Sequence, residues 1–310
     1  MVRPSDGVGE DGRSWVELEL DPGSTVEEHL LVRNLSRETV TFQLTAADGY
    51  FTATGRFNML TSDQESVDAG TWIEIQDSIE VPSGGDAIVP FTITVPENAT
   101  PGDHPAGVAA SIRSGGEVGV ESRVGFRVMT RVTGEMAPAL TTSVSGTYTG
   151  SINPFEPGTL TLTYEVSNTG NVRLGVESLA TVSGPFGWLA RTLDPETITE
   201  IAPGESRTFE RQVRGVWPLF VATVDVVSQG ASVAEDLEVG EIAPSEAQAT
   251  VITMPWSQLV VIAIIVLLIV LSALDRRRRK RKTEALIAQA RADAVAEAVA
   301  AAQRANTSGT

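Results

Sequence analysis

The sequence predicts an all-β protein. Two tandem immunoglobulin-like (Ig-like) β-sandwiches precede a single transmembrane α-helix and a short helical cytoplasmic tail. Three observations support this fold class. Apolar residues alternate with polar ones between turn signals throughout 14–228, this pattern occurs twice, and nineteen uncharged residues from Trp256 to Leu274 precede a basic cluster. Alternation is typical of half-buried strands, and an uncharged run of this length spans a membrane as a helix.

The alternation places one apolar face on each predicted strand. One apolar face per strand is what a sandwich of two antiparallel sheets requires, and no helical period occurs before Trp256. The rows of apolar residues are Val40, Phe42, Leu44 and Ala46; Val89, Phe91, Ile93 and Val95; Val124, Phe126, Val128 and Val132; and Leu160, Leu162, Tyr164 and Val166.

The pattern repeats in two copies of about 110 residues. In each copy, a Pro-Gly turn at 22–23 or 157–158 precedes a strand that ends at an asparagine, Asn34 or Asn168. A second turn with proline and glycine follows in each copy, at 82–85 and 203–204. Proline presets φ and glycine supplies positive φ, so both pairs mark turns between strands.

We therefore predict five segments. Residues 1–134 and 135–228 form the two sandwiches, and the acidic stretch 229–254, poor in apolar residues, forms a flexible stalk. Residues 255–274 form the transmembrane helix. Residues 275–310 contain the stop-transfer cluster and a tail whose 283–303 segment favours helix by composition. The tail helix is interpreted either as a solvated juxtamembrane helix or as a helix that binds a partner.

The basic cluster orients the chain. Positive charge beside a span stays cytoplasmic, so the tail is predicted inside and everything before Trp256 outside. Because Met1 leads directly into polar sequence, we expect a secretion signal that was trimmed or that lies upstream of the assigned start. The predicted membrane anchor comprises Trp256, Arg276, Arg277, Arg278, Arg279, Lys280, Arg281 and Lys282.

Charge and cysteine content limit the partners. The net charge is −17, and the part before Asp275 alone carries −22, so binding of nucleic acid by bulk charge is not expected. The chain has no cysteine, which favours a bacterial surface protein over a secreted eukaryotic module and excludes thiol nucleophiles.

Catalytic and metal-binding patterns are weak. The two histidines, His29 and His104, lie far apart, and no nucleophile-elbow, metalloprotease or P-loop motif occurs. We predict no enzyme activity, no cofactor and no metal. The acidic segment 6–12 is interpreted as a mobile N-terminal arm, with a Ca²⁺ loop as the alternative.

Residues 1–133 resemble the WxL-interacting proteins, a family of Gram-positive surface proteins that includes a former domain of unknown function. The resemblance rests on Val2-Arg3-Pro4, on the segment 18–34 with its Asp-Pro-Gly turn, and on the Pro-turn-Pro-Gly-strand segment 95–111. It implies a first domain that binds peptidoglycan and a second domain that engages other surface proteins.

Six residues are candidates for ligand contact. Arg123, Arg127 and Arg131 recur on one face of a strand, where arginines either contact anions of a wall polymer or acidic partner, or pair with neighbouring acids on an outer sheet face. The others are Asp103 and His104, in a predicted binding loop at 99–107, and Trp72, which either stacks on a sugar or belongs to the core.

The predicted function is a non-catalytic scaffold that tethers peptidoglycan or surface proteins at the membrane. The alternative is a membrane signalling or assembly subunit that acts through its cytoplasmic helix.

Overall fold

The computed structural model describes residues 1–52, 54–113, 121–233 and 242–307. The chain forms two compact units. One contains Met1–Tyr148, Leu160–Val213 and Val221–Ile252, and the other contains Thr149–Thr159, Arg214–Phe220 and Thr253–Thr310. The first holds most of the strands, and the second holds the C-terminal helix with two loops.

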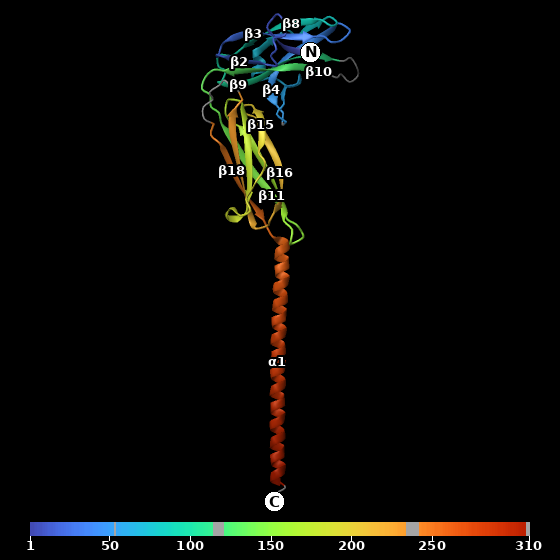
Figure 1. The fold of residues 1–310 in the computed structure, drawn as a ribbon, viewed down its shortest axis with the longest axis vertical. Coiled ribbons are helices and arrows are strands. Elements are labelled where there is room, and N and C mark those ends of the chain that lie inside the picture. Colours follow the sequence, from blue (N-terminus) through green and yellow to red (C-terminus); the bar gives the residue numbers. More distant parts are fainter. Residues whose placement is uncertain (53, 114–120, 234–241, 308–310) are drawn as a thin grey trace. The chain divides into compact units, whose positions relative to one another are not determined.

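The protein is mostly β, as the alternation predicts (Figure 1). The elements are β1 (Val2–Ser5), β2 (Val16–Leu20), β3 (Thr25–Arg33), β4 (Val40–Phe51), β5 (Phe57–Met59), η1 (Ala69–Trp72), β6 (Ile73–Ile75), β7 (Ser78–Val81), β8 (Asp86–Thr94), β9 (Gly102–Arg113), β10 (Glu121–Val132), β11 (Leu140–Thr149), β12 (Gly158–Asn168), β13 (Leu174–Ser183), η2 (Pro185–Gly187), β14 (Arg191–Thr192), β15 (Glu196–Ile201), β16 (Ser206–Val216), β17 (Phe220–Ser232), β18 (Ser245–Thr253) and α1 (Trp256–Thr307).

Strands β1–β10 form an Ig-like sandwich of two sheets. One sheet has the order β1-β3-β8-β6, and the other has the order β2-β10-β9-β4-β5, with β7 beside β4. The inward rows of both sheets share one core, which includes Leu30, Phe91, Phe126 and Val128. The first strands divide between the sheets, because β1 pairs antiparallel with β3 whereas β2 pairs parallel with the second half of β10.

Strands β11–β18 form two further sheets, β11-β12-β16 and β14-β13-β17-β18, with β15 beside β13. In β12 every second residue is buried, so the predicted row Leu160, Leu162, Tyr164 and Val166 faces inward. Tyr164 stacks on Phe209 of β16, with ring centroids 5.1 Å apart.

The repeat in the sequence corresponds to a repeated set of hydrogen bonds from the side-chain amides of Asn34 and Asn168, which we name the asparagine locks. The side-chain amide of Asn34 donates to the carbonyls of Glu38, Val81 and Pro82. The amide of Asn168 donates in the same way to Val172 and Ile201. Each asparagine therefore ties the end of one strand to the turn that follows and to the second turn of its copy.

Two segments that were predicted to be flexible are ordered where the structure describes them, and residues 234–241 of the predicted stalk lie outside the described residues. The predicted stalk contains the end of β17 and all of β18, which pair with each other. Small residues such as Ala247 and Ala249 alternate inward in β18, so its low apolar content concealed a strand. The acidic N-terminal arm is held in place, because Asp6 accepts two backbone N–H groups and Arg13 pairs with Glu28.

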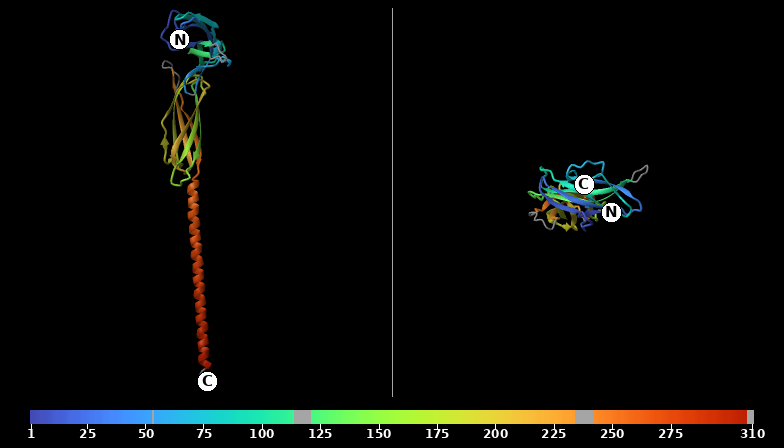
Figure 2. Two further views of the ribbon diagram at one scale, coloured as in Figure 1. Left: turned by 90° about the vertical axis from the view of Figure 1, so that its right-hand side faces the viewer. Right: turned by 90° about the horizontal axis from the view of Figure 1, so that it is seen from above.

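The C-terminal segment is one uninterrupted helix, α1, which includes both the predicted span and the predicted tail helix (Figure 2). It is long and apolar enough to cross a membrane. No glycine or proline occurs between Trp256 and Thr307, which explains why the helix continues through the basic cluster.

Candidate functional site

The predicted arginine stripe lies on β10, and all three guanidinium groups contact other parts of the chain. Arg123 donates to the carbonyl oxygens of Met59 and Leu60, at 3.0 and 2.8 Å. Arg127 donates to Glu200 at 2.7 Å and lies over the ring of Trp15, 4.2 Å from its centroid. The stripe therefore contacts the chain's own acceptors.

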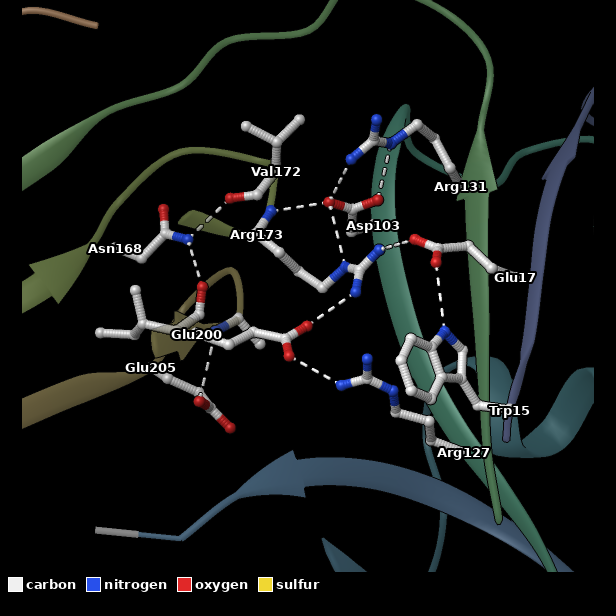
Figure 3. Close-up of polar contacts among 12 residues, drawn as sticks. Trp15, Glu17, Asp103, Arg127, Arg131, Asn168, Val172, Arg173, Glu200 and Glu205 are labelled. Carbon is white, nitrogen blue, oxygen red and sulfur yellow. Dashed lines mark hydrogen bonds and ion pairs between the residues drawn. The ribbon is translucent and has the colours of Figure 1, made fainter. Parts of the chain in front are cut away.

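Arg131 and Asp103 are both buried. The Nε and Nη2 atoms of Arg131 donate to the two carboxylate oxygens of Asp103, each at 2.7 Å (Figure 3). The backbone N–H of Arg173 donates to the same carboxylate at 2.6 Å. Because paired, hydrogen-bonded charges are the ones that tolerate burial, this arrangement accounts for an acid and an arginine in the interior.

Arg173 connects the strands before and after residue 134. Its guanidinium group donates to Glu200 at 2.7 Å and also to Glu17, and it forms an ion pair with Asp103 at 3.4 Å (Figure 3). Burial alone would raise the pKa of Glu17, but the hydrogen bond and charge of Arg173 lower it below its ordinary value. Glu17 therefore remains a carboxylate. We use the name acid–arginine cluster for the six residues that these contacts connect, which are Glu17, Asp103, Arg127, Arg131, Arg173 and Glu200.

Gly102 lies next to this cluster and permits a close backbone contact. Its φ is +130°, and a Cβ at this position would lie 2.1 Å from the carbonyl oxygen of Asn171. That carbonyl accepts the N–H of Asp103 at 2.8 Å, and the Asn171 amide donates to Pro101 at 2.9 Å. Only glycine fits here without displacing the backbone.

The predicted binding loop at 99–107 is mostly strand, because β9 begins at Gly102. Asp103 and His104 consequently lie in a sheet. His104 Nδ1 contacts Asp68 at 2.8 Å, and Nε2 contacts the Thr100 carbonyl at 2.8 Å. The strand follows directly from the turn at 101–102, which sequence analysis extended too far.

Trp72 packs against His104, with ring centroids 4.7 Å apart. The tryptophan is 9% exposed, so its ring lies in the core and not on an open face. Burial lowers the pKa of His104, but the hydrogen bonds to Asp68 and Thr100 outweigh this and raise it above the ordinary value. The contacts of His104 with Trp72 and Asp68 link η1 and the residue before it to β9.

The first half of β10 has a free edge. Residues 121–127 pair with β9 on one side, whereas β2 covers the other side only from Val128 to Val132. Within the described ranges, no strand pairs with this other side of 121–127, although β1 of the opposite sheet lies near β10. We name residues 122–127 the open edge of β10.

The apolar row of β10 that faces the core continues to the open edge, where no other element covers its last side chain in the described part of the chain. Val124 and Phe126 point to the same face because side chains alternate along a strand, and Phe126 lies in the core. Val124 is nevertheless 51% exposed. Ile112 of β9, opposite Ser122, is 38% exposed. An apolar face next to unpaired backbone groups is suited to an additional strand.

The predicted membrane-anchor residues all lie on α1, where Trp256 is the first residue and is exposed. The side chains of the basic cluster 276–282 are exposed, and Arg279 pairs with Asp275 one turn earlier at 2.8 Å. The helix thus presents an apolar segment followed by a cationic one.

Sequence analysis missed several residues. Arg173 and Glu200, which complete the acid–arginine cluster, were not considered, although an arginine between Val172 and Leu174 interrupts an apolar run and could have been noticed. Asp48 was also missed. It is buried, and its carboxylate accepts the N–H groups of Val67, Asp68 and Gly70, at 2.6 to 2.9 Å, which fixes η1.

Comparisons with known proteins find structural likeness only. No family model and no curated protein matches the chain. Among solved structures, the class 5 fimbriae chaperone CfaA is 10% identical, with a TM-score of 0.38, and the match covers 81% of this chain and 99% of that one. The Pseudomonas aeruginosa CupB2 chaperone is 13% identical, with a TM-score of 0.31 and coverage of 78% and 99%. The E. coli chaperone DraB is 12% identical, with a TM-score of 0.33 and coverage of 80% and 96%.

The predicted membership of the WxL-interacting protein family is therefore wrong. No family model matches, and the solved structures that resemble the chain over most of its length include several fimbrial chaperones. Turn-and-strand signatures such as Asp-Pro-Gly recur in many sandwiches, which explains the error. The predictions of peptidoglycan tethering and of a Gram-positive cell-wall location depended on that resemblance, so they are wrong as well. At these identities and TM-scores the chaperone likeness carries no conclusion about function.

Proposed function

We propose that this chain is a single-pass membrane assembly subunit whose β-sandwiches, outside the membrane, bind an extended segment of another envelope protein by strand addition. The apolar part of α1 is the span, and the basic cluster 276–282 keeps the C-terminal end cytoplasmic. The division into two sandwich domains near residue 134 is part of the proposal, with the second domain extended through β18. Its support is that no sheet combines strands from β1–β10 with strands from β11–β18 in the described part of the chain.

The observation that carries the proposal is the open edge of β10. A strand added there would bond to backbone groups that β2 leaves unpaired, and every second side chain would cover Val124 and extend the core row of Phe126. Each backbone hydrogen bond contributes about 0.5–1.5 kcal/mol, and covering the apolar row adds about 25 cal/mol per Å².

The chemistry of the edge defines the segment. Alternate residues of the segment should be apolar, because they would lie over Val124 and Phe126, and the others should be polar or basic, because the part before Asp275 carries −22. Two of the three arginines of the stripe are neutralised, because Arg127 pairs with Glu200 and Arg131 with Asp103. The third, Arg123, donates to the carbonyls of Met59 and Leu60. Recognition therefore depends on backbone and apolar contacts.

The first test uses the full chain in detergent and a synthetic nine-residue peptide of alternating valine and threonine with one terminal lysine. Hydrogen exchange should slow at residues 122–127 when the peptide is added. A peptide of the same composition with its valines contiguous should have a smaller effect. Val124→Lys should abolish protection, whereas Val67→Lys, at another exposed valine, should preserve it. Equal protection in both variants would overturn the proposal.

The second test concerns the tail. Deletion of residues 283–310 should leave peptide protection at the edge unchanged, because binding is assigned to β10. If this deletion abolishes the cellular phenotype of the full chain while protection persists, the helix after the basic cluster also takes part in assembly.

A further inference from the structure

The compact unit that contains α1 also carries two loops with exposed apolar side chains. These loops are 149–159 and 214–220, and we name them the interface loops. Ile152 is 96% exposed and Phe155 81%, and Trp217 and Phe220 are exposed as well. Large apolar residues grouped in this way and facing solvent usually mark a contact surface.

The first interface loop is held in one conformation. The side chain of Asn153 accepts the N–H of Phe155 at 3.1 Å, and its carbonyl accepts the N–H of Glu156 at 3.2 Å. Ser151 accepts the N–H of Asn153 at 3.1 Å and donates to the Glu156 carboxylate at 3.2 Å. These bonds form a tight turn that leaves Ile152 and Phe155 outside it. The exposure of both side chains is therefore built into the loop.

The second interface loop contains backbone strain at an aromatic residue. Phe220 has φ of +73°, a conformation that is rare for bulky residues. It follows a turn in which the N–H of Leu219 donates to the Trp217 carbonyl at 3.0 Å. Strain of this kind persists only where the surrounding structure holds the residue in place.

The start of α1 is tied to the first loop. The side-chain amide of Gln258 donates to the carbonyl of Pro154 at 2.9 Å. Pro154 lies between Ile152 and Phe155 in the sequence. Trp256, two residues before Gln258, is exposed and begins the apolar helix. The loop therefore lies beside the first turn of the span.

We propose that the interface loops insert Ile152, Phe155, Trp217 and Phe220 into the outer headgroup region of the lipid bilayer. This rests on the proposed function, because it requires α1 to cross the membrane. Aromatic and apolar residues at the end of a span favour the boundary between headgroups and acyl chains, where tryptophan is enriched. The loops belong to the same compact unit as the start of the span, so a bilayer that accepts α1 reaches them without a further partner.

The test takes advantage of the absence of cysteine, because an introduced cysteine is the only thiol in the chain. Ile152→Cys, Trp217→Cys, Ile265→Cys and Leu35→Cys carry nitroxide labels in full chains reconstituted one per lipid nanodisc. Collision with oxygen relative to a water-soluble nickel complex reports immersion. Ile265 lies within the span, and Leu35 is an exposed leucine in the first sandwich.

At positions 152 and 217, the ratio of oxygen collisions to nickel-complex collisions should be several-fold higher than at position 35. It should be lower than at position 265, which lies within the span. A second set adds Phe155→Ser with Phe220→Ser to the labelled Ile152→Cys chain, and immersion should decrease. Val67→Ser serves as the control and should leave the ratio unchanged.

Three results would overturn the proposal, and they are distinguishable. A water-like ratio at 152 and 217 with a lipid-like ratio at 265 would reject loop insertion alone. A water-like ratio at 265 would reject the span and with it the membrane part of the proposed function. In a parallel sample with several chains per nanodisc, immersion of labels 152 and 217 that is absent from the one-chain sample would show that a second copy, not lipid, covers the loops.

Discussion

Asp103 and Arg131 face each other directly in the register of β9 and β10, and their side chains form two hydrogen bonds of 2.7 Å while both are buried. The carboxylate also accepts the backbone N–H of Arg173, which belongs to the other half of the chain. One acid therefore supports both a cross-strand pair and the connection between the halves.

Replacing Asp103 should be costly. Asp103→Asn leaves Arg131 without its counter-charge in the interior, and breaking a buried pair in this way typically destabilises by about 3–5 kcal/mol. Denaturant unfolding of the full chain in detergent measures the change. Asp86→Asn, which removes the exposed pair with Arg33, serves as the control and should not alter the midpoint measurably. Equal losses in the two variants would contradict the assigned role.

The backbone contact at Gly102 leads to a second prediction. Gly102→Ala should destabilise by about 1–2 kcal/mol from positive φ, and by about 1–3 kcal/mol more from the clash with the Asn171 carbonyl. Gly12→Ala separates the two effects, because Gly12 has φ of +82° but no heavy atom within 4 Å of the added Cβ. Thermal unfolding should show the larger loss at Gly102, and a similar loss at both positions would exclude the clash.

His104 makes stability depend on pH. Its folded pKa is above the ordinary value of 6.5, so protonation favours the folded state. The resulting stability is fully present below pH 6.5 and is lost as pH rises through the folded pKa. His104→Gln should remove this decline in stability with rising pH. Urea unfolding midpoints measured from below pH 6.5 to well above it test this. The other histidine provides the control, because His29→Gln should retain the decline that His104 causes. A decline that survives in His104→Gln would refute the assignment.

The asparagine locks should be equivalent in the two copies. Asn34→Ala and Asn168→Ala each leave buried carbonyls without their donor, at a cost of about 1–3 kcal/mol. Asn58→Ala removes an exposed amide that donates to the Tyr50 hydroxyl and accepts the N–H of the adjacent Met59, so its effect should be smaller than that at either lock. Unfolding midpoints of the three variants test this, and an effect at only one lock would argue against structural equivalence.

Local patterns predicted the fold well where they were strong. The alternation in 87–95 and 158–168 gave the buried rows directly, because side chains in a strand must alternate between faces. The two repeated asparagines, Asn34 and Asn168, also make equivalent hydrogen bonds in the two copies. The pattern failed at β18, where small residues fill the inward positions and give almost no hydropathy signal.

The site was harder to predict because its residues meet through tertiary structure. Arg127 and Arg131 were recognised as a stripe, but their acids Glu200 and Asp103 lie 73 and 28 positions away. The exposure of Val124 depends on where β2 stops covering β10, which no local pattern records. The family resemblance failed for a related reason, since turn motifs describe local geometry and are shared by unrelated sandwiches.

The continuity of α1 gives it a length that a bilayer does not need. At about 1.5 Å per residue, the helix measures about 78 Å, whereas the proposed span would need only about 30 Å to cross a bilayer core. No glycine or proline interrupts the helix between its first turn, where Gln258 donates to the Pro154 carbonyl, and the basic cluster, so the sequence provides none of the usual causes of a kink there. In the proposed function, the two ends of α1 would therefore be joined by a continuous helix that extends well beyond the bilayer core.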